Sequence, residues 1–162
     1  MKVIDDFLPS IEFTEIQKLM MDFGFPWYYN DCVTTANDNS EFQFVHMFYS
    51  PLGGVVTEYP RWREILKPYC DHLVRTAILR IKANLNVKQK SFIERELHQD
   101  FDVPCKTAIA YINDNNGYTL FEDGTKVHSK ANRVIVFDSH IRHAGVPCTD
   151  KNRRVVINFN YL

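Results

Sequence analysis

The chain lacks the features that mark membrane, secreted and repetitive proteins. No uninterrupted apolar run approaches the ~20 residues that a membrane-spanning helix needs, and the sequence contains no internal repeat or low-complexity segment. Its opening, MKVIDD, reaches acidic side chains too early for the apolar core of a secretory signal. We therefore expect a globular protein of the cytoplasm that does not associate with a membrane.

An excess of charge of one sign is also absent. The sequence has 19 Lys and Arg residues against 20 Asp and Glu residues, which gives a formal net charge of -1 at pH 7. This balance excludes the broad basic surface that attracts proteins to nucleic acid. No basic stripe with interleaved aromatic residues appears either. We expect no nucleic-acid partner.

Cysteine is scarce and scattered. The four cysteines are Cys32, Cys70, Cys105 and Cys148, and no two of them form a CxxC pair. They do not have the ligand spacing of a structural zinc site, and a chain with this much potential core does not need disulfides. We expect four free thiols in a reducing compartment.

The 162 residues suit one domain with a sizeable core, since 45% of them are hydrophobic and 24% are charged. Apolar residues at helical spacing predict two helices in the first half, the second kinked or split at Pro68. Residues 1–78 thus form a supporting region. The elements expected there are a strand at Val3–Leu8, a helix at Ile11–Phe23 capped by Ser10, a turn at 37–40, a strand at Glu41–Tyr49 and a helix from about Pro60 to Leu73.

From residue 79 onward the apolar period changes to two, which marks a half-buried strand from Leu79 to Val87. Short strands separated by turn residues follow it. Helices first and many short strands afterwards predict a mainly β (α+β) protein, an antiparallel barrel or double sheet with N-terminal helices packed on the outside. The later strands are expected at Ser91–His98, Lys106–Asn113, Tyr118–Glu122, Lys126–His128, Arg133–Phe137 and Arg154–Tyr161.

The segment His98-Gln99-Asp100 carries the first candidate site residues. Alternate side chains of a strand share a face, so His98 and Asp100 would present an imidazole nitrogen and a carboxylate oxygen side by side. This pair is a weak signal alone, but His140 or His143 can complete a set of two histidines and one carboxylate. Such a set suits non-haem Fe(II), because it leaves positions open for substrate or oxygen. We favour His143, because Ala144-Gly145 gives its loop room beside a metal.

Taken in order, the pieces of the second half resemble the prolyl-4-hydroxylase-like branch of the 2-oxoglutarate- and Fe(II)-dependent dioxygenases. The resemblance covers nearly all of the chain and implies a double-stranded β-helix (jelly-roll, cupin-like) in which residues 79–162 form the core that carries the site. The matching residues are His98, Asp100, Tyr111-Ile112-Asn113 after Lys106, Asn116-Gly117-Tyr118 with Leu120-Phe121-Glu122, His143, Arg154 and the opening Val3–Leu8.

The resemblance implies a cofactor set and a role for several residues. Fe(II) would be bound by His98, Asp100 and His143, with His140 as the alternative histidine. The cosubstrate 2-oxoglutarate would place its far carboxylate on Arg154, whose planar fork matches a carboxylate with two hydrogen bonds. Arg153 is the alternative, and we favour Arg154 because it heads the final strand as the family arginine does. Tyr111 would donate a hydrogen bond to the same carboxylate. O2 would be the oxidant, with ascorbate as a candidate reductant.

The implied activity is hydroxylation of a C–H bond with release of succinate and CO2. The expected substrate is a prolyl residue in a peptide or protein, and a free amino acid or another small molecule is the alternative. A non-catalytic cupin-type domain that binds a metal or small molecule is the competing class. The sequence leaves the oligomeric state open. The candidate substrate-binding residues are Trp27, Tyr28, Tyr29, Glu122, Asn158 and Asn160.

Overall fold

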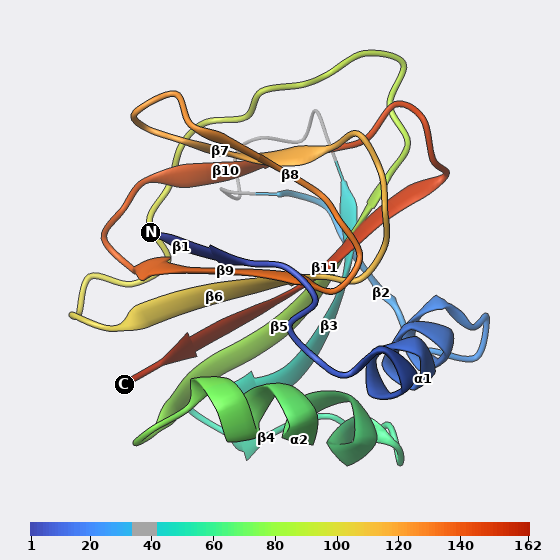
Figure 1. Ribbon diagram of the computed structural model, residues 1–162, viewed down its shortest axis with the longest axis vertical. Coiled ribbons are helices and arrows are strands. Elements are labelled where there is room, and N and C mark those ends of the chain that lie inside the picture. Colours follow the sequence, from blue (N-terminus) through green and yellow to red (C-terminus); the bar gives the residue numbers. More distant parts are fainter. Residues whose placement is uncertain (34–41) are drawn as a thin grey trace.

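The computed structural model describes residues 1–33 and 42–162 (Figure 1). The turn expected at 37–40, and the first residue of the strand expected at 41–49, lie outside these residues. The helices are α1 (Ser10–Met21) and α2 (Trp62–Leu73). The strands are β1 (Lys2–Ile4), β2 (Tyr28–Asn30), β3 (Gln43–Ser50), β4 (Gly54–Val55), β5 (Ile78–Val87), β6 (Lys106–Tyr111), β7 (Tyr118–Phe121), β8 (Lys126–His128), β9 (Arg133–Asp138), β10 (His143–Val146) and β11 (Arg153–Tyr161).

The strands form two antiparallel sheets. The larger has the order β1-β9-β6-β11-β5-β3-β2 with β4 paired to β3, and the smaller has the order β10-β7-β8. The smaller sheet lies over one face of the larger sheet, and both helices pack on the other face (Figure 1). This arrangement confirms the predicted double-stranded β-helix with helices on the outside.

Strand alternation gives the larger sheet two chemically different faces. On β11 the side chains of Val155, Ile157 and Phe159 join the core beneath the helices, which also contains Ile65 and Tyr69 of α2. The intervening side chains of β11 point toward the smaller sheet. The space between the two sheets holds polar residues as well as a second apolar cluster, to which both sheets contribute and which consists of Ile109, Tyr111, Phe121, Val127, Ile135, Phe137 and Val156.

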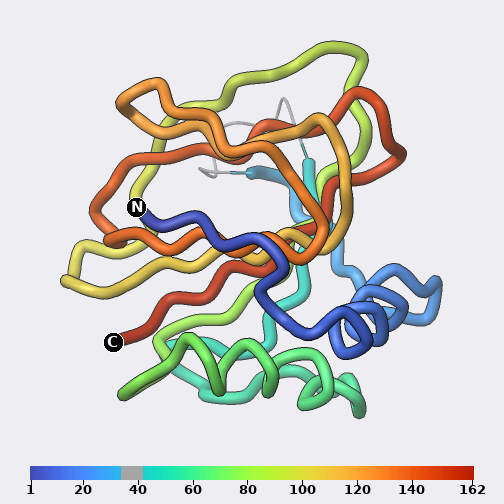
Figure 2. The backbone as a smooth tube through the Cα atoms, viewed as in Figure 1, coloured from blue at the N-terminus to red at the C-terminus, as the bar shows by residue number. Residues whose placement is uncertain are grey.

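The N-terminal residues close the edge of the larger sheet. Lys2 pairs with Val136 and Ile4 with Val134, so the first residues of the chain run beside β9 (Figure 2). Asp5 then bonds to Arg133 and Lys130. The expected opening strand is therefore present but ends at Ile4.

Three expected local features are wrong. Residues 91–98 do not form a strand but an irregular extended connection with an isolated bridge at His98, because the charged run around Arg95 offers no apolar face to a sheet. The helix α2 continues through Pro68, so the expected alternative of two short helices is wrong. Ser10 is the first residue of α1 and makes no capping bond.

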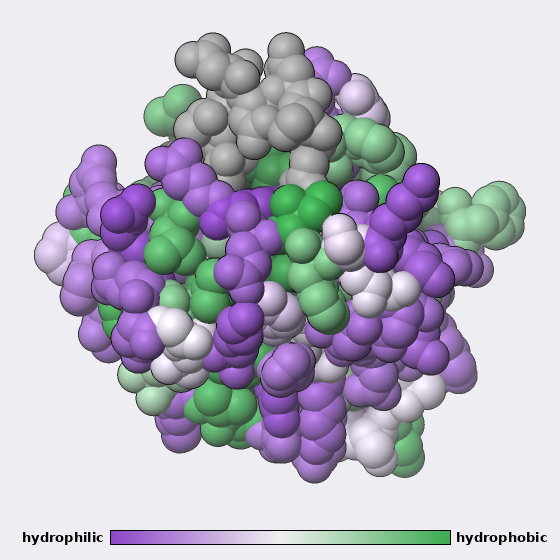
Figure 3. All heavy atoms as spheres, turned by 90° about the horizontal axis from the view of Figure 1, so that it is seen from above, coloured by the Kyte–Doolittle hydropathy of each residue, from purple (hydrophilic) through white to green (hydrophobic). Residues whose placement is uncertain are grey.

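The outer surface follows the usual pattern of a globular fold. Seen from above, hydrophilic residues cover most of the visible face, and apolar residues appear between them in small groups (Figure 3). Within residues 1–33 and 42–162, no helix is long and apolar enough to span a bilayer. All four cysteines are free, as the sequence predicted.

Candidate metal centre

Two histidines and an aspartate meet at one end of the space between the sheets. His98 and Asp100 belong to the connection between β5 and β6, and His143 begins β10. The His98 N–H donates to the His143 carbonyl (3.0 Å) and the His143 N–H donates to the His98 carbonyl (2.9 Å). This bridge fixes the two imidazoles with ring centroids 4.9 Å apart. One ligand atom from each of the three residues lies within 4.8 Å of the others.

Asp100 is held by three donors. Its carboxylate accepts hydrogen bonds from Arg80 Nη2 (2.6 Å), Thr107 Oγ1 (3.1 Å) and Asn160 Nδ2 (3.0 Å). Burial would raise the pKa of Asp100, but the Arg80 guanidinium, with smaller effects from His143 and Asn160, holds this pKa below its ordinary value. The buried carboxylate is therefore ionised and its orientation fixed, as a metal ligand requires.

The histidines are oriented as neutral ligands. His143 Nδ1 lies 3.1 Å from the Ile141 carbonyl, so this nitrogen carries the proton and Nε2, 4.0 Å from Asp100 Oδ2, keeps its lone pair. Burial, reinforced by the neighbouring His143, lowers the pKa of His98. His98 Nδ1 is buried without a hydrogen-bond partner in the described part of the chain. Burying a polar nitrogen without a partner costs free energy, and a metal ion bound at this nitrogen would remove that cost.

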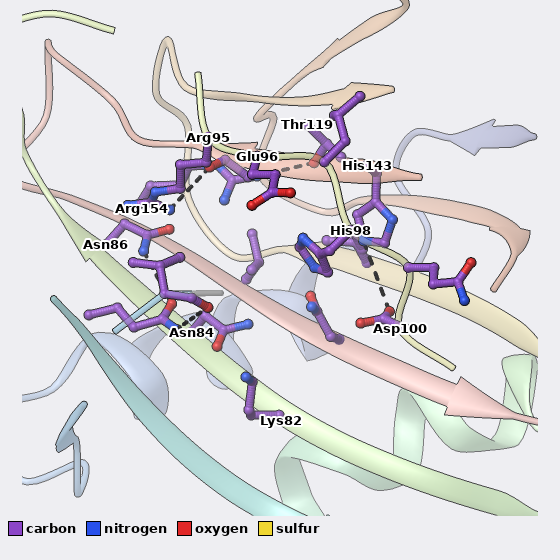
Figure 4. A pocket seen from close by; sticks show the side chains of 18 of the residues that line it. Lys82, Asn84, Asn86, Arg95, Glu96, His98, Asp100, Thr119, His143 and Arg154 are labelled. Atoms are coloured by element: carbon purple, nitrogen blue, oxygen red, sulfur yellow. Dashed lines mark hydrogen bonds and ion pairs between the residues drawn. The ribbon is translucent and has the colours of Figure 1, made fainter. Parts of the chain in front are cut away.

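A cavity of about 330 Å³ extends from this cluster between the two sheets (Figure 4). Its far end contains Arg154, Thr119 and Asn86, which lies opposite Arg154 on β5, and Asn84 lies between the two ends. The lining residues are Val33, Gln43, Arg80, Lys82, Asn84, Asn86, Arg95, Glu96, Leu97, His98, Gln99, Asp100, Ile109, Thr119, His143, Gly145, Arg154, Val156 and Asn158.

Arg154 is a buried cation whose hydrogen-bond partners among the described residues are neutral, and the nearby Arg95 carries a charge of the same sign. It is 2% exposed, and it donates from Nε to Ser129 Oγ (3.0 Å) and from Nη2 to Thr119 Oγ1 (3.2 Å). Its guanidinium carbon lies 5.5 Å from the centre of the Tyr111 ring. Burial lowers the pKa of Arg154. No ion pair to Arg154 occurs among residues 1–33 and 42–162. A buried charge without a counter-ion is unfavourable, so this end of the cavity is suited to an anion.

The alternative histidine and the alternative arginine, His140 and Arg153, do not line the cavity. His140 is exposed in the turn before β10 and takes no part in the three-residue cluster. Arg153 points away from the cavity and donates from Nη2 to the Met21 carbonyl (2.7 Å). Tyr111 is fully buried outside the cavity lining, and its hydroxyl hydrogen-bonds with Thr119 Oγ1 (2.7 Å). Tyr111 thus lies beside both Thr119 and Arg154, and its expected hydrogen bond to a cosubstrate stays a prediction.

Most of the expected substrate residues are not in the cavity. Trp27 packs on Phe25, whereas Tyr28 and Tyr29 lie on the edge strand β2 and are largely exposed. Glu122 is exposed in the turn after β7. Asn160 is fully buried, and its side-chain amide donates a hydrogen bond to Asp100. Only Asn158 of this set lines the cavity.

Sequence reasoning missed the residues that support the cluster and line the cavity floor. Arg80, Lys82, Asn84 and Asn86 alternate along β5, which the sequence shows plainly. A half-buried strand normally turns such polar residues to solvent, but here they face the smaller sheet. The signal that could have identified them is four polar residues at period two in the strand that precedes the His-X-Asp pair.

Comparison with known proteins gives the fold a context. Neither protein-family models nor curated proteins yield a match. Among solved structures, an oxidoreductase of the 2OG-Fe(II) oxygenase family from Burkholderia pseudomallei is similar, with a TM-score of 0.66 and 15% identity over 98% of this chain and 83% of that chain. A Pseudomonas putida prolyl-4-hydroxylase has a TM-score of 0.61 and 14% identity over 98% and 90% of the two chains.

A prolyl hydroxylase from Trichoplax adhaerens is also similar. It was solved in complex with a peptide fragment of a hypoxia-inducible factor oxygen degradation domain, and has a TM-score of 0.69 and 15% identity over 98% of this chain and 82% of that chain. At such identities the similarity establishes the architecture. The chain therefore has the double-stranded β-helix fold of the 2OG-Fe(II) oxygenases, prolyl hydroxylases among them.

Proposed function

We propose that the protein is a non-haem Fe(II)- and 2-oxoglutarate-dependent dioxygenase that hydroxylates a C–H bond. The observation that carries this proposal is the pairing of two features in one cavity. A cluster of two histidines and an ionised aspartate lies at one end, and a buried arginine without a described counter-ion lies at the other.

The donor set fits ferrous iron. His98, Asp100 and His143 supply two imidazole nitrogens and one carboxylate oxygen, the facial set of non-haem Fe(II) oxygenases. When bound, Fe(II) would couple the activation of O2 to oxidative decarboxylation of 2-oxoglutarate, giving succinate, CO2 and a hydroxylated product. Arg80, Thr107 and Asn160 would keep Asp100 ionised and aimed at the site.

The far end of the cavity would bind the cosubstrate. The Arg154 fork can donate two parallel hydrogen bonds to the carboxylate of 2-oxoglutarate that lies away from the metal. Thr119 and Ser129 hold the guanidinium in place, and Tyr111 orients Thr119 from behind. Tyr111 is thus a positioning residue in this proposal. Ile109 and Val156 provide apolar lining that would limit the access of water.

A non-catalytic metal-binding module of the same fold is the competing reading. Such a module has no need for an arginine buried at the far end of its cavity, where desolvation of the charge lowers stability. Arg154 therefore favours the dioxygenase. We propose the reducing cytoplasm as its compartment, in keeping with four free cysteines, and ascorbate as a reductant.

The substrate is a finer part of the proposal. The structural similarity to prolyl hydroxylases, one of them bound to a peptide, supports a prolyl residue of a peptide or protein. A free amino acid or another small molecule is the alternative. Lys82, Asn84 and Asn158, in the middle of the cavity, help to distinguish a free amino acid from a peptide.

The proposed activity is tested by the conversion of 2-oxoglutarate. Purified protein loaded with Fe(II) should form succinate slowly in air without an added substrate, and chelation of the iron should stop it. Metal-loaded, folded protein that forms no succinate would favour the binding module instead.

A further inference from the structure

The floor of the cavity is a ladder of paired polar residues on β5 and β11. Cross-strand register pairs Arg80 with Asn160, Lys82 with Asn158, Asn84 with Val156, and Asn86 with Arg154. The first pair supports Asp100, and the last contains the arginine assigned to the cosubstrate. The two middle pairs have no role in the proposed chemistry, although three of their four side chains are polar.

Lys82 is the charged member of these middle pairs. It lines the cavity and points up into it from β5 (Figure 4). Its ammonium group has three donors, yet within the described ranges it makes neither a hydrogen bond nor an ion pair. Arg80 is neutralised by Asp100, and Arg154 would be neutralised by the cosubstrate. Of the three cations on the cavity floor, Lys82 therefore remains available to bind a second anion.

Two amide oxygens beside Lys82 are also unpaired. Asn84 is 9% exposed, and its Oδ1 is buried without a hydrogen-bond partner in the described structure. Asn158 Oδ1, directly across from Lys82, is in the same state. Buried acceptors are rarely left unpaired in folded proteins. Together with Lys82 they indicate a ligand that brings both an anionic group and hydrogen-bond donors.

A carboxylate lies on the opposite side of the cavity. Glu96 belongs to the connection that crosses above the ladder, and its side chain points down into the cavity while Lys82 points up (Figure 4). Glu96 is exposed at this rim and forms no ion pair with the described residues. The cavity thus presents a cation on its floor and an anion on its rim.

We infer that this part of the cavity binds the substrate, and that the substrate is a small zwitterionic amino acid. The inference rests on the proposed dioxygenase activity. The substrate carboxylate would lie on Lys82, its ammonium group would face Glu96, and the oxygens of Asn84 and Asn158 would accept its remaining donors. A prolyl residue inside a peptide carries neither charge, and it would leave Lys82 and Glu96 without partners. A volume of about 330 Å³ for both cosubstrate and substrate also suits a small molecule.

The test compares free amino acids with their uncharged derivatives. The probes are the twenty free L-amino acids, the C-terminal amide of each, and a proline peptide capped at both ends, added to Fe(II)-loaded protein with 2-oxoglutarate in air. At least one free amino acid should accelerate succinate formation tenfold or more, and its amide should not. Lys82→Met should raise the amino acid concentration for half-maximal stimulation at least tenfold, and Lys82→Arg should restore most of the affinity.

A matched control is Lys90→Met, which removes an exposed lysine from the loop after β5 and should match the wild-type protein. Three results would overturn the inference. In the first, the capped peptide stimulates succinate formation equally in the wild type and in Lys82→Met. In the second, the amides stimulate succinate formation as strongly as the free amino acids. In the third, the main effect of Lys82→Met is a rise in the KM for 2-oxoglutarate. The last would assign Lys82 to the cosubstrate.

Failure of the proposed function is distinguishable from failure of the inference. If the wild-type protein forms no succinate, either with or without an added amino acid, the dioxygenase proposal fails. Calorimetric titration of the same amino acids into the metal-free protein then tests the site alone. Binding that Lys82→Met abolishes would support the amino-acid site, and no binding by any of them would overturn it.

Discussion

At the scale of single residues, the candidate site depends on how each charge is compensated. Asp100 has three donors within 3.1 Å, whereas the equally buried Arg154 has only neutral hydroxyl partners among its described neighbours. The charge of Asp100 is balanced by Arg80 within the protein, whereas Arg154 has no described counter-ion. This contrast indicates that Asp100 is held in place by the protein itself, whereas Arg154 is suited to bind an anionic ligand.

The two candidate histidines can be distinguished by metal retention. His143→Ala should reduce bound Fe(II) from about one ion per chain to near zero after anaerobic desalting, because it removes one of three ligands. His140→Ala should retain the metal, since His140 is exposed and outside the cluster. Metal analysis of both proteins measures this, and the opposite pattern would show that the ligand assignment is wrong.

The two adjacent arginines can be distinguished by cosubstrate affinity. Arg154→Met should raise the KM for 2-oxoglutarate at least tenfold, since a hydrogen bond to a charged group contributes about 1.5–3 kcal/mol. The ligand-free variant should unfold at the same temperature as the wild type or higher, because it no longer buries an unpaired charge. Arg153→Met is the control and should leave this KM nearly unchanged. Equal effects of the two variants would contradict the assignment.

At the scale of secondary-structure elements, close packing between β7 and β11 fixes the arginine. A Cβ atom at Gly117, just before β7, would lie 2.8 Å from Arg154 Cδ and 2.8 Å from the Val146 carbonyl oxygen. Gly117→Ala should therefore destabilise the protein by about 1–3 kcal/mol and weaken binding of 2-oxoglutarate. Urea unfolding and the KM for 2-oxoglutarate measure the two effects. Gly145→Ala, whose Cβ would be 3.4 Å from Arg154 Nη1, should have a smaller effect on both.

The attachment of the N-terminal segment to β9 predicts a pH dependence of stability. Hydrogen bonds from Arg133, and then Lys130, lower the pKa of Asp5 from 3.8 to about 2. A depressed carboxyl pKa stabilises the folded state above pH 4, and this contribution disappears as the pH falls toward 2. Because the Asp5 side chain is 40% exposed, the contribution at pH 7 should be only about 0.5 kcal/mol.

Asp5→Asn tests this contribution directly. The difference in unfolding free energy between variant and wild type should be present at pH 7 and should vanish near pH 2. Asp6→Asn is the matched control, since the Asp6 side chain is 81% exposed and 4.0 Å from Lys130. A difference for Asp5→Asn that persists at pH 2 would show that the carboxylate charge is not its cause.

Most elements of the second half could be predicted from sequence, because each carries a local signal. The strands β5, β6, β7, β8, β9 and β11 lie where alternating apolar residues placed them. The short strand β10 could not be predicted, since His143-Ala144-Gly145-Val146 has no clear period. Residues 91–98 look like a strand locally, but only His98 finds a backbone partner there.

At the scale of the whole molecule, the three residues that the structure brings together as a candidate metal site were predictable from the sequence, and the residues around them were not. His98, Asp100 and His143 follow a spacing that the sequence displays. The contacts of Asp100 with Arg80 and Asn160 join residues 20 and 60 positions apart, and they depend on the register of β5 against β11. Trp27, Tyr28 and Tyr29 do not line this cavity, because Tyr28 and Tyr29 lie on β2 at the sheet edge and Trp27 directly precedes that strand, and their expected substrate contacts stay untested.

The central claim is that a ferrous ion on His98, Asp100 and His143 shares one cavity with 2-oxoglutarate on Arg154. The most direct measurement is the visible absorption spectrum of the anaerobic protein with Fe(II) during addition of 2-oxoglutarate. A weak metal-to-ligand charge-transfer band should appear and saturate at one equivalent per chain, and it should be absent from His143→Ala. Folded, iron-loaded wild-type protein that develops no such band would contradict the account.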